Sequence, residues 1–105
     1  MSLVDKQHFH AMRLARLFFY ADSLGYQIAG GAWGLLENEI AGERHDLHTV
    51  RLLTNVNVSR HGTLLFDVDS VKPLGDYWET LGGTWGGNFD TPKVNHFSTP
   101  YQGHV

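Results

Sequence analysis

The first quarter of the chain contains no residue that interrupts a helix, and this run constrains the fold most. From Ser2 onward the sequence has neither glycine nor proline until Gly25, which suits a left-handed C-cap. Ser2 and Asp5 have the spacing of a capping box. We therefore expect one long helix whose apolar and aromatic residues build the core. The first expected apolar row is Leu14, Leu17, Ala21 and Leu24. A neighbouring row is Met12, Ala15 and Phe19, and the solvent-exposed side carries Lys6, Arg13 and Arg16.

The middle of the chain alternates in the manner of a β-strand. Apolar and β-branched residues occupy every second position from Val50 to Val58, which predicts a half-buried strand beginning near residue 46. The Ser-Arg-His-Gly stretch that follows predicts a hairpin turn, in which Gly62 takes the backbone angle that other residues avoid. We expect this turn to pair the strand with residues 63–68.

Shorter elements complete the expected fold. We expect a late helix that begins at Pro73. Its apolar side is formed by Tyr77, Trp78 and Leu81. The remaining segments predict a strand and bend over 26–33, a short helix over 34–42, a loop over 84–94 and a final strand over 95–98. The fold class is therefore α+β: a small antiparallel sheet packed against a long N-terminal helix and a second late helix.

Length and composition favour a single domain over residues 1–105. The chain has no cysteine, which excludes disulfide bonds and thiolate metal sites. Its formal net charge of −3, without a basic stripe, gives nucleic-acid binding little support. It has no apolar run near the roughly 18 residues of a membrane helix and no signal-peptide pattern at its start. We expect no membrane interaction, a cytoplasmic location, and solvated side chains at His8, His10 and His104.

Three stretches of the sequence bear on function. The strand stretch DLHTVRLLTNVNV contains His48, which fits a metal site, a hydrogen-bonded network or no special role. Together with LGDYWETLGGTWGGNF and NHFS, it resembles the small phage and prophage zinc peptidases of the L-alanyl-D-glutamate endopeptidase and D-alanyl-D-alanine carboxypeptidase group. That group has the Hedgehog/DD-peptidase fold. The resemblance covers nearly the whole chain, and the WGGxF loop leading to NHF is its most specific part.

The resemblance implies a zinc ion held by two histidines and an aspartate, with an acidic general base. The histidines match His48 and His96. The aspartate, seven positions after the first histidine, is Asn55 here, and the general base, three positions before the second histidine, is Lys93. A family serine two positions before the first histidine is Asp46. Both ligating histidines are therefore present, while the acids are replaced.

These departures remove the expected chemistry. A carboxamide is a poor third donor to zinc, and a lysine does not take the proton of a bound water near neutral pH unless burial strongly lowers its pKa. We expect no catalytic residue and no resident cofactor, and zinc at most at low affinity through two otherwise structural histidines. A rewired site would have to use Asp46 or Asp90. The family's substrate-gripping arginine is missing near Gly34, and the implied cleft keeps Arg51 and Trp85, for which structural roles also fit.

Two functions follow from the resemblance. The first is a non-catalytic phage- or prophage-type binding protein on a degenerate peptidase scaffold, acting on an unidentified bacterial protein such as a defence or regulatory factor. The second is an active zinc-dependent peptidase that cleaves peptidoglycan between L-Ala and D-Glu or at D-Ala-D-Ala, with a rewired metal site. A muropeptide-binding module without turnover is an intermediate case, which the missing arginine disfavours.

Overall fold

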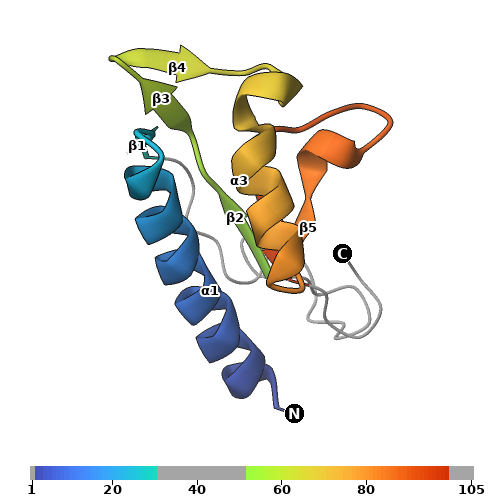
Figure 1. Cartoon of the computed structure of the whole chain (residues 1–105). Helices are drawn as coiled ribbons and strands as arrows, with labels where there is room; N and C mark the ends of the chain where they lie inside the picture. The colour runs from blue at the N-terminus through green and yellow to red at the C-terminus, as the bar shows by residue number, and fades with distance from the viewer. Residues whose placement is uncertain (1, 31–51, 100–105) are drawn as a thin grey trace.

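The chain folds into helices packed on small antiparallel sheets, as Figure 1 shows. The computed structural model describes residues 2–30 and 52–99. Within them the α+β class is confirmed, with two three-stranded sheets, of strand orders β1-β3-β4 and β2-β6-β5, instead of the one sheet expected. The elements are α1 (Leu3–Ser23), β1 (Gln27–Ile28), β2 (Leu52–Asn55), β3 (Val58–Arg60), β4 (Thr63–Leu65), α3 (Val68–Thr80), β5 (Thr84–Trp85), the 3₁₀ helix η1 (Gly86–Asn88) and β6 (His96–Thr99).

The long helix α1 has the ends that the sequence predicts. The Ser2 hydroxyl accepts a hydrogen bond from the Asp5 backbone N–H at 3.1 Å, and the Asp5 carboxylate accepts one from the Ser2 N–H at 3.3 Å. Gly25 follows the helix with φ of 84°, in the left-handed region that favours glycine. A side-chain N-cap such as that of Ser2 contributes about 1 kcal/mol. Both ends of α1 are therefore set by local interactions.

The two apolar rows of α1 have different environments. Leu14, Leu17 and Ala21 are buried, which confirms the first row, although Leu24 beyond them is largely exposed. The second row was expected in the core, and this is wrong: Phe19 is 80% exposed, and Met12 and Ala15 are also exposed. The reason is that one side of α1 packs against α3 and the sheets, and the second row lies on the other side.

Helix α3 begins earlier than the sequence analysis places it. Asp67 is the N-cap, and its carboxylate accepts a hydrogen bond from the Ser70 N–H at 2.9 Å. Pro73, expected to open the helix, lies inside it instead, so the helix lacks one N–H donor in its second turn. The predicted apolar side is confirmed at Trp78, which is fully buried and donates from its indole N–H to the backbone oxygen of Ser98 at 3.0 Å.

The predicted central strand is divided between the two sheets. β2 pairs with β6 and β3 pairs with β1 and β4, so only residues 58–60 join the expected hairpin. The division falls at two residues: the Val56 N–H donates to Asn95 O at 2.9 Å, and the Asn57 N–H donates to Gly30 O at 2.9 Å. The backbone therefore changes hydrogen-bonding partners at these two residues, which the alternation of apolar residues does not reveal.

The turns and the last strand agree in part with expectation. The hairpin turn is confirmed, with positive φ at both His61 and Gly62, as a two-residue type I′ turn requires. The final strand is also confirmed as β6. The prediction of a loop over 84–94 is wrong at its start, because β5 pairs with β6 there and the 3₁₀ helix η1 follows β5. The bend after residue 30, the short helix over 34–42, the beginning of the strand at 46–51 and His104 lie outside the described residues.

The core lies between the helices and one face of the β2-β6-β5 sheet. Its largest fully buried side chains are those of Trp78, Trp85 and Phe97. Figure 1 shows α1 and α3 side by side, with the β1-β3-β4 sheet at the end where α1 finishes and α3 begins. Neither helix contains an apolar stretch of the length that crossing a lipid bilayer requires.

Candidate functional site

The second face of the β2-β6-β5 sheet carries the residues that the resemblance connects with zinc. Asn55 in β2 lies directly opposite His96 in β6. Residues opposite each other in an antiparallel pair project from the same face, so these two side chains are neighbours. Thr54 and Phe97, the next pair along, project to the core face and are fully buried. The sheet therefore brings together one predicted histidine and the amide at the position where the resemblance implies an aspartate ligand.

The imidazole of His96 is held by its surroundings. It is only 4% exposed, and its Nε2 lies 2.9 Å from the Ser98 hydroxyl oxygen on the same face of β6. The Phe89 ring meets it at an angle of 64°, with 4.9 Å between the ring centroids. Gly86 leaves room for it, because a Cβ at that position would stand 2.6 Å from the His96 Cβ. The ring is thus fixed between β6 and the segment that begins with η1.

The two charged residues expected near this histidine lie in the segment before β6. The backbone of Lys93 is fixed, since its N–H donates to Gly86 O at 2.8 Å and its carbonyl accepts from the His96 N–H at 3.1 Å. The side chains of Lys93 and Asp90 are exposed, whereas His96 is buried. The position that the resemblance connects with the general base therefore holds an exposed lysine side chain.

The remaining predicted ligands and cleft residues are not all described. His48, Asp46 and Arg51 lie outside the described residues, as does Gly34, so a two-histidine zinc site stays a prediction. Within residues 2–30 and 52–99, no three histidine or carboxylate side chains gather closely enough to hold a metal ion.

Trp85, predicted to line the cleft or the core, is fully buried. Its indole N–H donates to the backbone oxygen of Val94 at 2.8 Å. Gly75 of α3 and Gly87 of η1 both lie so close to the indole ring that a Cβ at either position would overlap it. The ring therefore packs between α3 and η1 as a core side chain.

A buried histidine on α1 was missed by the sequence analysis. His10 was expected to be solvated, and this is wrong: it has 0% exposure, and its Nδ1 and Nε2 lie 2.7 Å from Thr99 Oγ1 and 3.0 Å from Thr54 Oγ1. Burial, with a smaller contribution from the positive charge of Arg13, lowers the pKa of His10 from 6.5 to about 4. Its spacing of four residues before Leu14 places it on the buried row, a signal that the sequence does contain.

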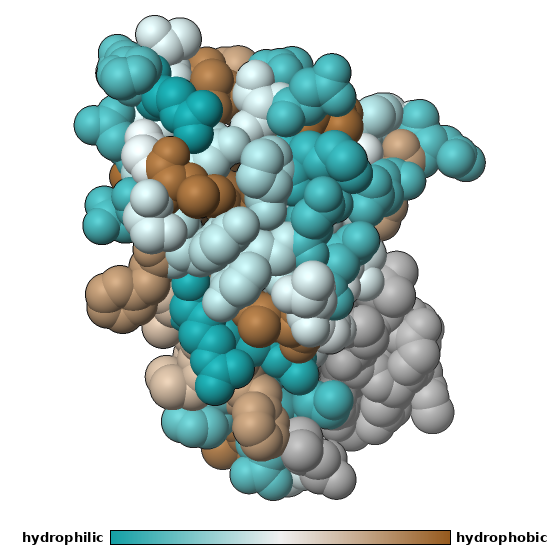
Figure 2. All heavy atoms as spheres, in the orientation of Figure 1, coloured by the Kyte–Doolittle hydropathy of each residue, from teal (hydrophilic) through white to brown (hydrophobic). Residues whose placement is uncertain are grey.

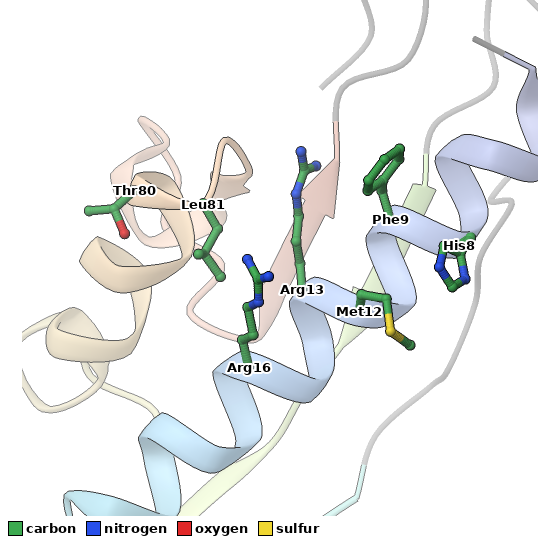
Figure 3. A pocket seen from close by; sticks show the side chains of 7 residues that line it. All are labelled: His8, Phe9, Met12, Arg13, Arg16, Thr80 and Leu81. Atoms are coloured by element: carbon green, nitrogen blue, oxygen red, sulfur yellow. The ribbon is translucent and has the colours of Figure 1, made fainter.

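A hollow of about 430 Å³ lies where α1 meets the end of α3 (Figure 3). From α1 it is lined by Arg13 and Arg16 together with apolar side chains, and from the end of α3 by Thr80 and Leu81. Figure 3 shows both arginines extending from α1 on the side where Leu81 lies. The complete lining is His8, Phe9, Met12, Arg13, Arg16, Thr80 and Leu81.

No protein-family model matches the chain, and neither the curated proteins nor the solved structures contain a significant match.

Proposed function

We propose that this protein is a non-catalytic binding protein on a degenerate zinc-peptidase scaffold of the phage and prophage type, with a Hedgehog/DD-peptidase-like fold. It acts by binding a protein of the bacterial host, for example a defence or regulatory factor. The proposal combines the sequence resemblance with the chemistry of the residues around His96. Function resides in sites, and a scaffold can keep its fold after the site has lost its chemistry.

The pairing of Asn55 with His96 is the observation that carries the proposal. If the chain has the family fold, these positions are two of the three zinc ligands, and they do lie opposite each other on β2 and β6. The side chain at the first position is a carboxamide. A neutral amide oxygen gives zinc neither the charge nor the affinity of a carboxylate, so a ligand set with this amide holds the metal weakly.

The environment of His96 and Lys93 supports the same conclusion. Hydrolysis by zinc needs an acceptor for the proton of the bound water. The Lys93 side chain is solvent-exposed, and an ammonium group has no lone pair with which to accept a proton. The His96 Nε2 is also engaged by the Ser98 hydroxyl. The described part of the site thus favours a structural histidine.

The test restores the missing acids. We expect the protein, purified without a histidine tag, to contain well under one equivalent of zinc and to release no fragments from purified peptidoglycan. The double variant Asn55→Asp, Lys93→Asp should bind about one equivalent of zinc, because it completes the set of two histidines and a carboxylate. Metal analysis by mass spectrometry and a peptidoglycan-release assay with added zinc measure both properties.

A matched control makes the same change of charge elsewhere. Gln27→Glu with Lys72→Asp alters an exposed residue of β1 and an exposed residue of α3, and we expect no gain of zinc. Tight stoichiometric zinc in the unmodified protein, with zinc-dependent release of muropeptides, would overturn the proposal. It would favour the active peptidase with a rewired metal site, using Asp46 or Asp90.

A further inference from the structure

We propose that the outward face of α1 is a docking surface for an acidic, amphipathic segment of another protein. We define the outward face as Phe9, Met12, Arg16 and Phe19. The inference rests on the proposed function, since it gives the chemistry of the partner that such a binding protein would hold. Three observations carry it: the spacing of these residues, the hollow beside them, and the charges around them.

The spacing places the four residues on one side of the helix. Steps of three, four and three residues separate them, which is the period of a single helical face. The buried row of His10, Leu14, Leu17 and Ala21 has the same period and faces the core. A helix that only covers a core needs one apolar face. The exposed fractions of Phe9 (44%), Met12 (47%) and Phe19 (80%) show a second one.

The surface view agrees with this arrangement. In Figure 2, apolar side chains in brown lie exposed along the flank where α1 runs, interspersed with polar ones. The hollow in Figure 3 borders this face, because Phe9, Met12 and Arg16 all line it. Its floor at the end of α3 is apolar at Leu81. A concave site that combines a few apolar side chains with two guanidinium groups suits an apolar side chain flanked by carboxylates.

The charges indicate which partner fits. Between Asp5 and Asp22, α1 carries three cations and no carboxylate, in a chain whose formal net charge is −3. The cations are Lys6, Arg13 and Arg16. Within residues 2–30 and 52–99, no carboxylate lies within ion-pair distance of either arginine, whereas the exposed Lys72 is paired with Asp76 at 3.2 Å. Guanidinium groups that have no carboxylate partner among the described residues, and that lie beside exposed aromatic rings, suit an anion supplied by a partner protein.

A second copy of the chain fits this face less well. Two α1 helices packed antiparallel through their outward faces would bring the arginines of both copies together. Between Asp5 and Asp22 the helix has no carboxylate that could neutralise them. Like charges placed together at an interface disfavour association. An acidic partner removes this repulsion, while its apolar side chains cover the exposed rings.

The test titrates ¹⁵N-labelled protein with a synthetic amphipathic helical peptide that carries leucine at helical spacing and glutamate elsewhere. We expect the backbone amides of residues 8–19 and 80–82 to shift in its ¹⁵N–¹H spectrum. A peptide with glutamine in place of every glutamate should bind at least about tenfold more weakly, since it loses the charge-assisted contacts. The variants Arg16→Gln and Phe9→Ser should weaken binding of the acidic peptide by a similar factor.

Lys72→Gln is the matched control, because it removes one exposed cation outside the hollow and should leave binding unchanged. The spectrum itself reports whether each variant is folded. The inference would be overturned if millimolar acidic peptide caused no shifts, or if the acidic and glutamine peptides bound equally. It would also be overturned if the Arg16→Gln variant bound the acidic peptide as tightly as the unmodified protein does, or if inorganic phosphate alone caused the same shifts. Sedimentation that showed self-association through this face would overturn it as well. These results leave the zinc and peptidoglycan tests untouched, so failure of the docking surface and failure of the proposed function are distinguishable.

Discussion

His10 is the residue whose environment differs most from its expected one. A polar ring without solvent contact is costly unless its nitrogens are hydrogen-bonded, and both nitrogens of His10 have a threonine hydroxyl within 3.0 Å. Its ring also meets Trp78 edge to face, with 5.6 Å between the centroids. His10 therefore connects α1 to β2, to β6 and to α3 through one side chain. This explains why a histidine occupies a position on the apolar row.

Acid should destabilise the fold through His10. Its pKa is about 4 in the folded chain and near 6.5 when unfolded, so between these values the unfolded chain binds a proton that the folded chain does not. The stability that neutral His10 contributes is fully present above pH 6.5 and is lost as the pH falls through this window. We expect the free energy of unfolding to fall by about 3 kcal/mol from this cause between pH 7 and pH 4. Urea unfolding across this range measures it.

His10→Gln separates this effect from other titrations. Glutamine keeps hydrogen-bonding groups near Thr54 and Thr99 and does not titrate, so the variant should lose this share of the pH dependence. Other groups titrate equally in both proteins, including Asp67, whose pKa is lowered by its hydrogen bonds from Ser70. A constant difference in unfolding free energy between the two proteins from pH 7 to pH 4 would contradict the prediction.

At the scale of elements, α1 has two apolar faces with opposite consequences. The buried row stabilises the fold by leaving water, while the outward face contributes less, because Phe19 is 80% exposed and Phe9 and Met12 keep 44% and 47% of their surface exposed. Within residues 2–30 and 52–99, Phe9 and Met12 pack only in part, and Phe19 stays 80% exposed. The helix thus has one face in the core and a second, partly exposed apolar face, which we propose binds another molecule.

Substitutions on the two faces of α1 should therefore differ. Leu17→Ala removes a side chain that is 1% exposed and should lower the free energy of unfolding by about 2–5 kcal/mol. Phe19→Gln alters a side chain that is 80% exposed and should change it by less than about 0.5 kcal/mol. Thermal unfolding followed by circular dichroism compares them. A large loss of stability in Phe19→Gln would mean that this ring packs against part of the molecule.

At the scale of the whole molecule, α3 and the β2-β6-β5 sheet interlock through Trp85. The indole lies against the backbone of α3 at Gly75, where no side chain intervenes. Trp78 fixes the same two elements from the helix side through its hydrogen bond to Ser98 O. The close approach of helix and sheet depends on this glycine, because any Cβ would overlap the ring.

Gly75→Ala should separate α3 from the sheet. Although alanine favours helices, its Cβ would overlap Trp85, and overpacking of this kind lowers the free energy of unfolding by about 1–3 kcal/mol. Tryptophan fluorescence during urea unfolding measures the loss. Asp76→Ala, the next residue of the same helix, is the control: it breaks only an exposed ion pair with Lys72, and we expect a change below about 0.5 kcal/mol. Equal stability of the Gly75→Ala and Asp76→Ala variants would show that the contact is loose.

Features set by neighbouring residues could be predicted from the sequence. The capping box of Ser2 and Asp5, the left-handed Gly25 and the turn at Gly62 depend on contacts within a few positions, and all three are present. The start of α3 is also set locally, because the Asp67 carboxylate accepts a hydrogen bond from the Ser70 N–H. It was nevertheless predicted wrongly, because Pro73 was taken as the first residue of the helix. Local residues therefore mark these helix ends and this turn, but two such residues, as Asp67 and Pro73, can predict different starts for the same helix.

The candidate site was predictable only in its residue types. The resemblance singled out Asn55 and His96, but their pairing across two strands depends on the register of β2 and β6. The burial of His10 depends in the same way on Thr54 and Thr99, which lie far away in the sequence. Long-range pairing of this kind is a property of the folded chain, because no local pattern specifies which strands meet.

By itself the sequence determined the long helix, its caps, the hairpin turn, the α+β class and the exclusion of disulfide bonds, since each follows from residue types at short range. Only the tertiary structure decided that the extended stretch changes partners at Val56 and Asn57, that His10 is enclosed, and that α1 keeps an exposed apolar face. The physical reason is that burial and strand pairing depend on contacts between segments that are far apart in the sequence. An apolar or polar side chain has no fixed environment until those segments pack.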